Sequence, residues 1–212
     1  MFSELMDLVL HLDQYLQTII ATYGVGVYAI LFAIIFCETG LVVMPFLPGD
    51  SLLFVTGALA ASRSLELHTL LLLLMAASFL GDNTNYWLGR FFAPRLFSHG
   101  SSRWLNPDHL ETTKNFFHRY GAKTVMLGRF LPIVRTFTPF VAGMSRMPVA
   151  QFMTFAAFGA VLWIGSLVMA GYFFGNIFWV KHNLTLVILG IIVLSLLPGL
   201  IQYWRARRAS NA

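Results

Sequence analysis

The stretch that decides the fold is Glu38-Thr39-Gly40-Leu41-Val42-Val43-Met44-Pro45-Phe46-Leu47-Pro48-Gly49-Asp50-Ser51, which interrupts a long apolar region. Pro45 and Pro48 each lack an N–H and clash with the preceding helical turn, and Gly49 permits a sharp reversal, so a helix must break here. A carboxylate stands on each side of the break. Broken backbone and charge at membrane depth are tolerated only where protein or a water-filled cavity satisfies them. The stretch therefore predicts a re-entrant hairpin that lines a transport site.

A second stretch repeats this design with the opposite charge: Arg129-Phe130-Leu131-Pro132-Ile133-Val134-Arg135-Thr136-Phe137-Thr138-Pro139-Phe140-Val141-Ala142-Gly143. Both stretches contain Phe-Leu-Pro. The candidate hairpin breaks are Pro45, Pro48, Gly49, Pro132 and Pro139. We therefore expect two re-entrant helical hairpins, at about residues 38–61 and 125–146.

The composition is that of a single integral membrane domain. Of the 212 residues, 58% are hydrophobic and only 11% are charged, and the mean hydropathy is +0.72. The net charge of +5 would suit nucleic-acid binding, but the basic residues gather in one loop and one tail, which is the pattern of membrane topology. The one cysteine, Cys37, excludes an internal disulfide and a cysteine-based metal cluster, and we find no metal-ligand spacing or cofactor motif in the sequence.

The segments around the hairpins predict an all-α membrane fold. Residues 1–22 have the pattern of an amphipathic helix, which we expect to dock against the protein core, and residues 23–212 form one membrane transport domain. The segments long enough to cross a membrane are 67–89, 150–174 and 183–204.

The distribution of charge predicts the orientation of these segments. The loop of about residues 90–123 and the tail after residue 204 are rich in Lys and Arg, so we place both in the cytoplasm. Counting back through the spans places the N-terminus in the cytoplasm as well, and it makes the two hairpins enter the membrane from opposite faces. This arrangement is the inverted repeat expected of secondary transporters.

Small residues in the span 150–174 permit close helix packing. Gly171 and Gly175 match the GxxxG pattern. In a membrane chain with 17 glycines this match is weak, so we expect internal packing ahead of dimerisation. Homo-oligomerisation is left open.

Arg129 and Arg135 are the candidate phosphate-binding residues. In an unbroken helix, two residues six positions apart would point about 120° away from each other. Pro132 lies between them and permits both guanidiniums to converge on one anion, and two planar forks of donors suit a phosphate. The alternative is that each arginine neutralises Glu38, Asp50 or Asp82 in a structural ion pair. The two arrangements can also be alternating states of one site.

Glu38, Asp50 and Asp82 are the candidate proton carriers. A carboxylate in a dry site is costly in its charged form, so it can take up a proton there and release it when water or an arginine approaches. Two structural alternatives stay open. Asp50 precedes an apolar run, where it could cap a helix, and Asp82 could bond Arg90 or Tyr86.

At these residues the sequence resembles the DedA family of bacterial inner-membrane proteins. The shared motifs are Phe36-Cys37-Glu38-Thr39-Gly40-Leu41-Val42-Val43, Pro45-Phe46-Leu47-Pro48-Gly49-Asp50-Ser51-Leu52-Leu53-Phe54, Gly81-Asp82 with Asn85-Tyr86, and Arg129-Phe130-Leu131-Pro132-Ile133-Val134-Arg135-Thr136-Phe137. The resemblance covers nearly the whole chain, and it implies opposed re-entrant hairpins and a role in membrane homeostasis that depends on the proton motive force. Some relatives are linked to recycling of undecaprenyl phosphate or translocation of phospholipids, and eukaryotic relatives behave as lipid scramblases. The essential acids and arginines of the family fall on Glu38, Asp50, Arg129 and Arg135.

The favoured function is proton-coupled transport of a phosphate-bearing lipid, because two arginines in one hairpin face acids across an inverted repeat. The alternative is a proton-coupled exporter of small cations or drugs, in which Glu38 and Asp50 bind the cargo and the arginines balance charge. An enzyme is not expected because no nucleophile–base pair is recognisable, and a purely structural scaffold leaves the membrane charges unexplained. The expected partners are a membrane lipid and protons, with no nucleic acid, metal or cofactor.

Overall fold

The computed structural model describes residues 12–41, 49–97 and 121–175, with single residues at 113, 117, 120, 177, 180, 186, 187, 189 and 190. Every regular element in this described part is a helix. In chain order they are α2 (Leu12–Tyr23), η1 (Gly24–Gly26), α3 (Val27–Gly40), α4 (Gly49–Ala61), α5 (Leu67–Phe97), η2 (Gly121–Lys123), α7 (Thr124–Leu127), η3 (Gly128–Phe130), α8 (Pro132–Met144) and α9 (Val149–Phe174), where η denotes a 3₁₀ helix. The predicted all-α class is confirmed.

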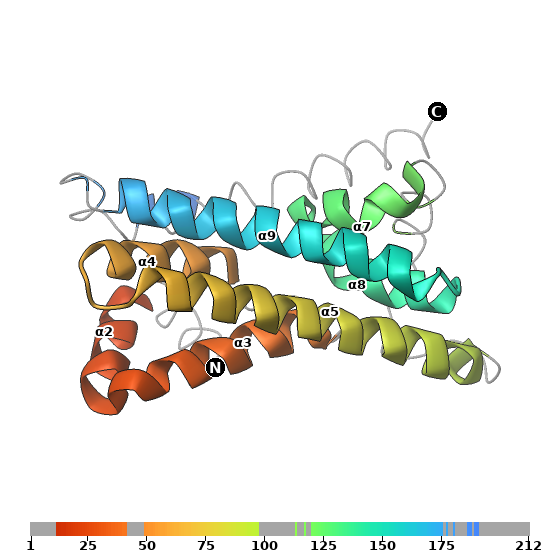
Figure 1. The fold of residues 1–212 in the computed structure, drawn as a ribbon, viewed down its shortest axis with the longest axis horizontal. Coiled ribbons are helices and arrows are strands. Elements are labelled where there is room, and N and C mark those ends of the chain that lie inside the picture. Colours follow the sequence, from red (N-terminus) through yellow and green to blue (C-terminus); the bar gives the residue numbers. More distant parts are fainter. Residues whose placement is uncertain are drawn as a thin grey trace, which may run out of the picture.

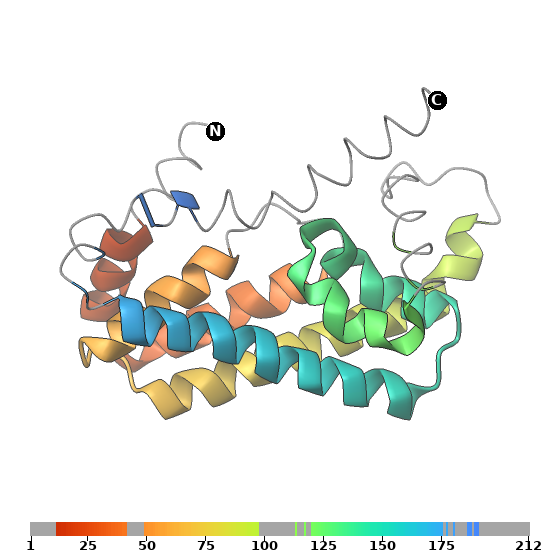
Figure 2. The same cartoon turned by 90° about the horizontal axis from the view of Figure 1, so that it is seen from above.

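Within the described residues, three helical stretches are long and apolar enough to cross a membrane. They are Thr18–Gly40, Leu67–Phe91 and Val149–Phe174, whereas α4 is apolar but shorter. The long helices α5 and α9 run side by side, with α4 toward one of their ends and α8 toward the other (Figures 1 and 2). The described residues therefore belong to a multi-pass membrane protein, in which α4 and α8 lie toward opposite ends of the central pair α5 and α9.

In the described part of each predicted hairpin, a leucine has extended backbone. Leu41 follows α3 with φ −104° and ψ 115°, and Leu131 joins η3 to α8 with φ −117° and ψ 111°. Pro132 explains the second break, because the residue before a proline avoids the helical region and a proline in the first turn of a helix loses no hydrogen bond. The polypeptide thus leaves helical geometry next to the predicted site in both halves.

The short helices α4 and α8 also end in the same way. Arg63 and Arg146 follow them with φ of 62° and 54°, which is the left-handed conformation that non-glycine residues rarely adopt. The N–H of Ser64 donates to the Leu59 carbonyl, and the N–H of Met147 donates to the Ala142 carbonyl, both at 3.0 Å. This pattern is a Schellman cap, which satisfies the last carbonyls of the helix.

The short helix of each half packs on the long helix of the other half through glycines. Gly57 of α4 faces Gly171 of α9, and Gly143 of α8 faces Gly89 of α5. A Cβ added at any of these four would lie between 1.9 and 2.1 Å from a carbonyl oxygen of the facing helix. Only glycine permits so close an approach. A Cβ at Gly175 would likewise lie 2.3 Å from Ala58 Cβ of α4, so both glycines of the Gly171–Gly175 pair pack internally, as predicted.

Helices α2 to α5 form a first half of the described chain and η2 to α9 form a second half, and the two halves share these features. The halves exchange contacts reciprocally, α4 with α9 and α8 with α5. Such reciprocity is expected of the predicted inverted repeat. The re-entrant hairpins, the inverted repeat and the entry of the hairpins from opposite membrane faces stay predictions.

Several predicted details differ in the structure. Helix α5 continues to Phe97 rather than ending at residue 89, so it extends into the predicted loop. Gly49 does not make the reversal, because it lies in the first turn of α4. Pro139 lies inside α8, which runs without interruption from Pro132 to Met144, so the break of this hairpin is at Leu131. A mid-helix proline removes one N–H donor without ending the helix here.

Other predicted features fall outside the described residues. They are Pro45 and Pro48, the amphipathic helix before Leu12, most of the loop 98–120 and most of the span 183–204. The described helix α2 continues the predicted N-terminal helix to Tyr23.

Labelling of single cysteines tests the predicted topology. With Cys37 replaced by serine, a cysteine beside Pro48 should react with an impermeant maleimide added outside intact cells, and one beside Pro132 should react only from the cytoplasmic side. A cysteine at Phe158, an exposed position on the spanning helix α9, is the unreactive control. Reaction of both hairpin cysteines from one common face would contradict the inverted repeat.

Candidate functional site

Five ionisable side chains from five separate elements, three of them buried and two partly buried, form a group that we call the charge cluster. Its members are Glu38 of α3, Asp50 of α4, Asp82 of α5, Arg129 of η3 and Arg135 of α8. Sequence analysis predicted all five, and the structure joins each arginine to at least one of the acids. Charged groups this deep in an apolar protein are costly unless they are paired.

Arg135 binds two carboxylates at once. Its Nη2 donates to Glu38 Oε1 at 2.5 Å, and its Nη1 donates to Asp50 Oδ1 at 2.7 Å. The side chain of Glu38 is 2% exposed, that of Arg135 13% and that of Asp50 21%. The two terminal nitrogens of one guanidinium thus bridge the acids on either side of the first break, which a planar fork can do and a single ammonium cannot.

Arg129 is buried more deeply and pairs with the third acid. Its Nη2 forms an ion pair with Asp82, its Nη1 donates to Ser78 Oγ at 2.7 Å, and Nη2 also donates to the Ala156 carbonyl at 3.3 Å. Its Nε lies buried without a hydrogen-bond partner in the described part of the chain. Most donors of this arginine are therefore occupied in the observed state.

The charges are divided between the halves. All three acids come from the first half and both arginines from the second, so every ion pair of the cluster joins the two halves. Three carboxylates against two guanidiniums leave one negative charge when all five groups are ionised. In a buried site that excess is relieved when one proton binds to a carboxyl group.

Trp163 of α9 completes the cluster, and sequence analysis missed it. Its Nε1 donates to Asp50 Oδ1 at 3.1 Å. The guanidinium carbon of Arg135 lies 4.6 Å from the ring centroid and that of Arg129 lies 5.8 Å from it. A tryptophan in a long apolar span carries no signal that separates it from a lipid-facing or core residue.

Asn85 ties the cluster to both breaks. The amide Nδ2 of this buried residue donates to the Thr39 carbonyl at 3.2 Å and to the Thr136 carbonyl at 3.1 Å. Thr39 lies beside Glu38 at the end of α3, and Thr136 follows Arg135 in α8. The Asn85 side chain thereby fixes the end of α3, which carries Glu38, relative to α8, which carries Arg135.

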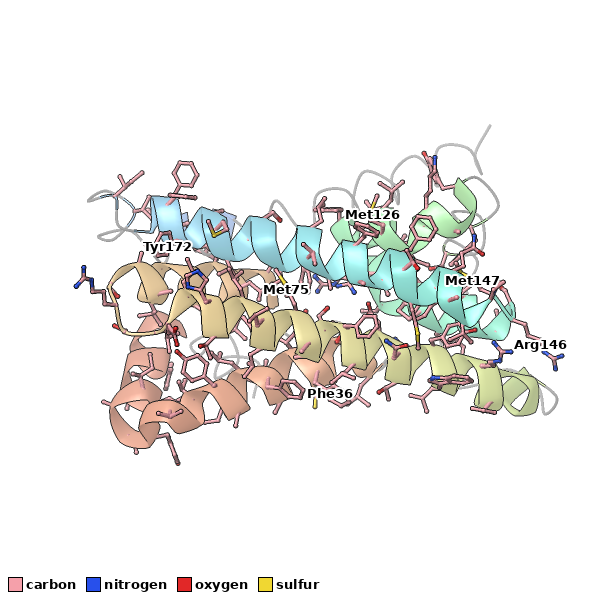
Figure 3. All side chains as sticks on the ribbon, viewed as in Figure 1. Phe36, Met75, Met126, Arg146, Met147 and Tyr172 are labelled. Carbon is pink, nitrogen blue, oxygen red and sulfur yellow. The ribbon has the colours of Figure 1, made fainter. Side chains whose placement is uncertain are left out.

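The contacts of Asp82 and Asp50 go beyond the structural alternatives that the sequence left open for them. Asp82 pairs with Arg129, while Arg90 donates to Tyr86 Oη at 2.6 Å and stacks over Trp87. Tyr86 in turn donates to the carbonyl of Met147, which lies just after α8 (Figure 3). Asp50 lies in the first turn of α4. Its carboxylate accepts hydrogen bonds from Arg135 and Trp163, so its role is not limited to capping α4.

Two glycines make room for the cluster. A Cβ at Gly49 would lie 1.8 Å from Glu38 Oε2, and a Cβ at Gly159 would lie 2.8 Å from Cδ and Nε of Arg129. Gly49 is therefore needed for the close approach of the Glu38 carboxylate rather than for a turn. No group of three His, Cys, Asp or Glu side chains that could hold a metal ion occurs among the described residues.

Gly159→Ala should impair the site without unfolding the protein. The added methyl group displaces the Arg129 side chain, so we expect a loss of activity of about tenfold or more, the equivalent of one disturbed charge-assisted hydrogen bond. Gly165→Ala is the matched control, because the nearest atom to its Cβ, Met75 Cε, is 3.9 Å away. Both changes favour the helix equally. Equal activity of the two variants in reconstituted membranes would contradict the prediction.

Comparison with known proteins places the chain in a family. The VTT domain matches residues 47–173, which include every member of the cluster except Glu38. Protein DedA of Escherichia coli K12 is 51% identical over 208 residues, 97% of this chain and 95% of DedA. An uncharacterised membrane protein of Mycobacterium tuberculosis is 40% identical over 88% of the chain and 83% of its own length. Inner membrane protein YqjA of Escherichia coli K12 is 36% identical over 70% of the chain and 68% of YqjA.

Fold and domain together define a multi-pass α-helical membrane protein that carries a VTT domain. The chain belongs to the DedA family, and the resemblance noted in the sequence is confirmed. No solved structure gives a significant match to the chain.

Proposed function

We propose that this protein is a proton-coupled transporter of phosphate-bearing lipids in the bacterial inner membrane, with undecaprenyl phosphate or a phospholipid as the substrate class. The observation that carries the proposal is the charge cluster, in which two arginines of one half are neutralised by three acids of the other. Buried ion pairs often leave a protein no more stable than apolar residues would, so a cluster of this size calls for a functional explanation.

The proposed coupling is an exchange of partners at Arg135. Its terminal nitrogens are occupied by Glu38 and Asp50 in the observed state, and a lipid phosphate would need the same donors. Protonation of these carboxyl groups weakens their hold on the guanidinium and frees it for the phosphate. Release of the phosphate returns the arginine to the ionised acids. Proton uptake and substrate binding are therefore linked through one side chain.

Arg129 and Asp82 form the second, drier pair, with exposed side-chain fractions of only 4% and 8%. Arg129 would add the second fork of donors to the phosphate once Asp82 is protonated or moves away. We assign Asp82 as a further proton-coupling residue on this ground. Because all pairs join the two halves, breaking them permits the halves to move relative to each other, as alternating access requires.

The second candidate function is a proton-coupled exporter of small cations or drugs. The excess of one acid in the cluster favours it, since a cationic cargo could replace the proton at Glu38 and Asp50. In that case the arginines only balance charge. An enzymatic role is not part of either proposal.

Transport by the purified protein in proteoliposomes separates the candidates. Fluorescent or isotopically labelled lipids that share the same chains should move across the bilayer when their headgroup carries a phosphate, as monoester or diester, and not when the headgroup is an uncharged alcohol without phosphate. Transport of a cationic dye at a rate that does not depend on the lipid headgroup would favour the exporter. Bilayers without protein and protein with both arginines replaced by alanine give the background.

A further inference from the structure

The face and the edge of the Trp163 indole contact opposite charges. The residue is 2% exposed, and its ring lies next to both guanidiniums, with centroid distances of 4.6 Å to Arg135 and 5.8 Å to Arg129. Its edge N–H donates to Asp50 Oδ1 at 3.1 Å. An indole suits both contacts because the ring face is electron-rich and the N–H is a donor.

Trp163, Asp50 and Arg135 form a closed triangle from three helices. The same Asp50 Oδ1 that accepts from Trp163 also accepts from Arg135 Nη1, at 2.7 Å. The third side is the contact between the guanidinium and the ring of Trp163. The triangle joins α4, α8 and α9, and α9 thereby contacts the ion pairs although it supplies no charge to them.

We propose that Trp163 is a positioning residue that holds Arg135 in the site while the guanidinium changes partners. This inference rests on the proposed function. Stacking on the ring face occupies none of the five N–H donors of the guanidinium. Arg135 can therefore release Glu38 and Asp50 and bind a phosphate without leaving its place. Without the ring, the freed side chain would have to be ordered again at each cycle, which costs conformational entropy.

A spectroscopic test examines the triangle independently of transport. In a chain in which the other four tryptophans, Trp87, Trp104, Trp179 and Trp204, are phenylalanine, the emission of Trp163 should shift when Arg135→Ala removes the charge above the ring. Arg90→Ala is the matched control, since that guanidinium lies over Trp87. No shift with Arg135→Ala, or an equal shift with Arg90→Ala, would overturn the inference. If the single-tryptophan chain is poorly inserted, 5-fluorotryptophan in the otherwise unchanged chain gives the same comparison by fluorine NMR.

A kinetic test asks what the ring does for the substrate. Phosphatidylcholine vesicles containing a minor fraction of undecaprenyl phosphate are the probe. Trp163→Leu removes both face and N–H and should raise KM about tenfold, whereas Trp163→Phe keeps a face and should raise it about threefold. Trp87→Leu, at an aromatic residue outside the cluster, should leave KM unchanged. Equal KM values for the leucine and phenylalanine variants would show that the face does not hold Arg135 and would overturn the proposal.

The two tests separate a failure of the proposed function from a failure of the proposed role of Trp163. If the wild type shows no flux of undecaprenyl phosphate or of any other phosphate-bearing lipid, the proposed function fails, but the emission of Trp163 still decides whether Arg135 is held by the ring. If lipid flux is present and the emission of Trp163 does not change with Arg135→Ala, the transport proposal stands and the proposed role of Trp163 is wrong.

Discussion

Arg135→Ala is expected to reduce lipid flux in proteoliposomes about a hundredfold or more. The change removes the only residue that binds Glu38 and Asp50 together in the described structure, and losing one partner of a buried charge pair costs about 2–5 kcal/mol. Arg135→Lys should recover little, because a point charge cannot bridge two carboxylates or present a planar fork to a phosphate. Full activity with lysine would indicate that Arg135 only balances charge.

The same experiment at Arg129 needs a control for folding. Arg129→Ala alone leaves Asp82 buried without its partner, so lost flux could reflect an unstable protein. The double variant Arg129→Gln with Asp82→Asn removes both charges and keeps a polar side chain at each position. We expect it to reach the membrane and melt close to the wild type while transporting as poorly as Arg129→Ala. Normal flux in the double variant would exclude a substrate role for Arg129.

Glu38→Gln and Asp50→Asn should uncouple transport from the pH gradient. Each amide keeps an oxygen that can accept from Arg135, but neither can titrate. We expect at least one of them to bind lipid phosphate yet lose the acceleration that an imposed pH gradient gives the wild type. The reason is that a group delivers a proton only if its occupancy changes during the cycle, and a permanently neutral amide has no such change.

Flux with and without the gradient is compared for the wild type and both amides. Asn caps a helix about as well as Asp, so Asp50→Asn leaves a capping role intact and a loss of coupling cannot be assigned to the cap. Thr154→Val, at an exposed hydroxyl that bonds only the Ala150 carbonyl of its own helix among the described contacts, is a control outside the cluster. A gradient response like that of the wild type in both amides would exclude these two residues as carriers and leave Asp82 as the next candidate.

Much of the cluster could be predicted from the sequence because charge and proline are conspicuous in apolar surroundings. Four ionisable residues near the two breaks, and Asp82 within a long apolar segment, were identifiable by residue type alone. Their pairing was not, because Arg135 reaches an acid 97 positions earlier in the chain, and only the packing of α8 against the first half brings the two together. The sequence left open whether Asp82 bonds Arg90 or Tyr86 for the same reason, whereas its partner is Arg129.

The features that sequence reasoning missed are those that look ordinary in a membrane helix. Trp163 and Gly159 lie in α9 among other apolar and small residues, and nothing in their spacing separates them from packing positions. Gly49 was noticed for the wrong physical reason. The backbone of Gly49 is helical. Glycine is required there because the Glu38 carboxylate occupies the space that a Cβ would need. This contact joins two separate segments, so no local sequence pattern can reveal it.

The division of acids and arginines between the halves has a consequence for biogenesis. During synthesis the ribosome releases Glu38, Asp50 and Asp82 first, and the nearest partner, Arg129, follows Asp82 by 47 positions. A nascent first half that has entered the bilayer therefore holds three carboxyl groups without Arg129 and Arg135, their ion-pair partners in the complete protein. The carboxyl groups must stay protonated, or in contact with water or the insertion machinery, until the second half arrives. A chain truncated before residue 121 should accordingly be retained by that machinery or degraded, rather than accumulate as a stable half.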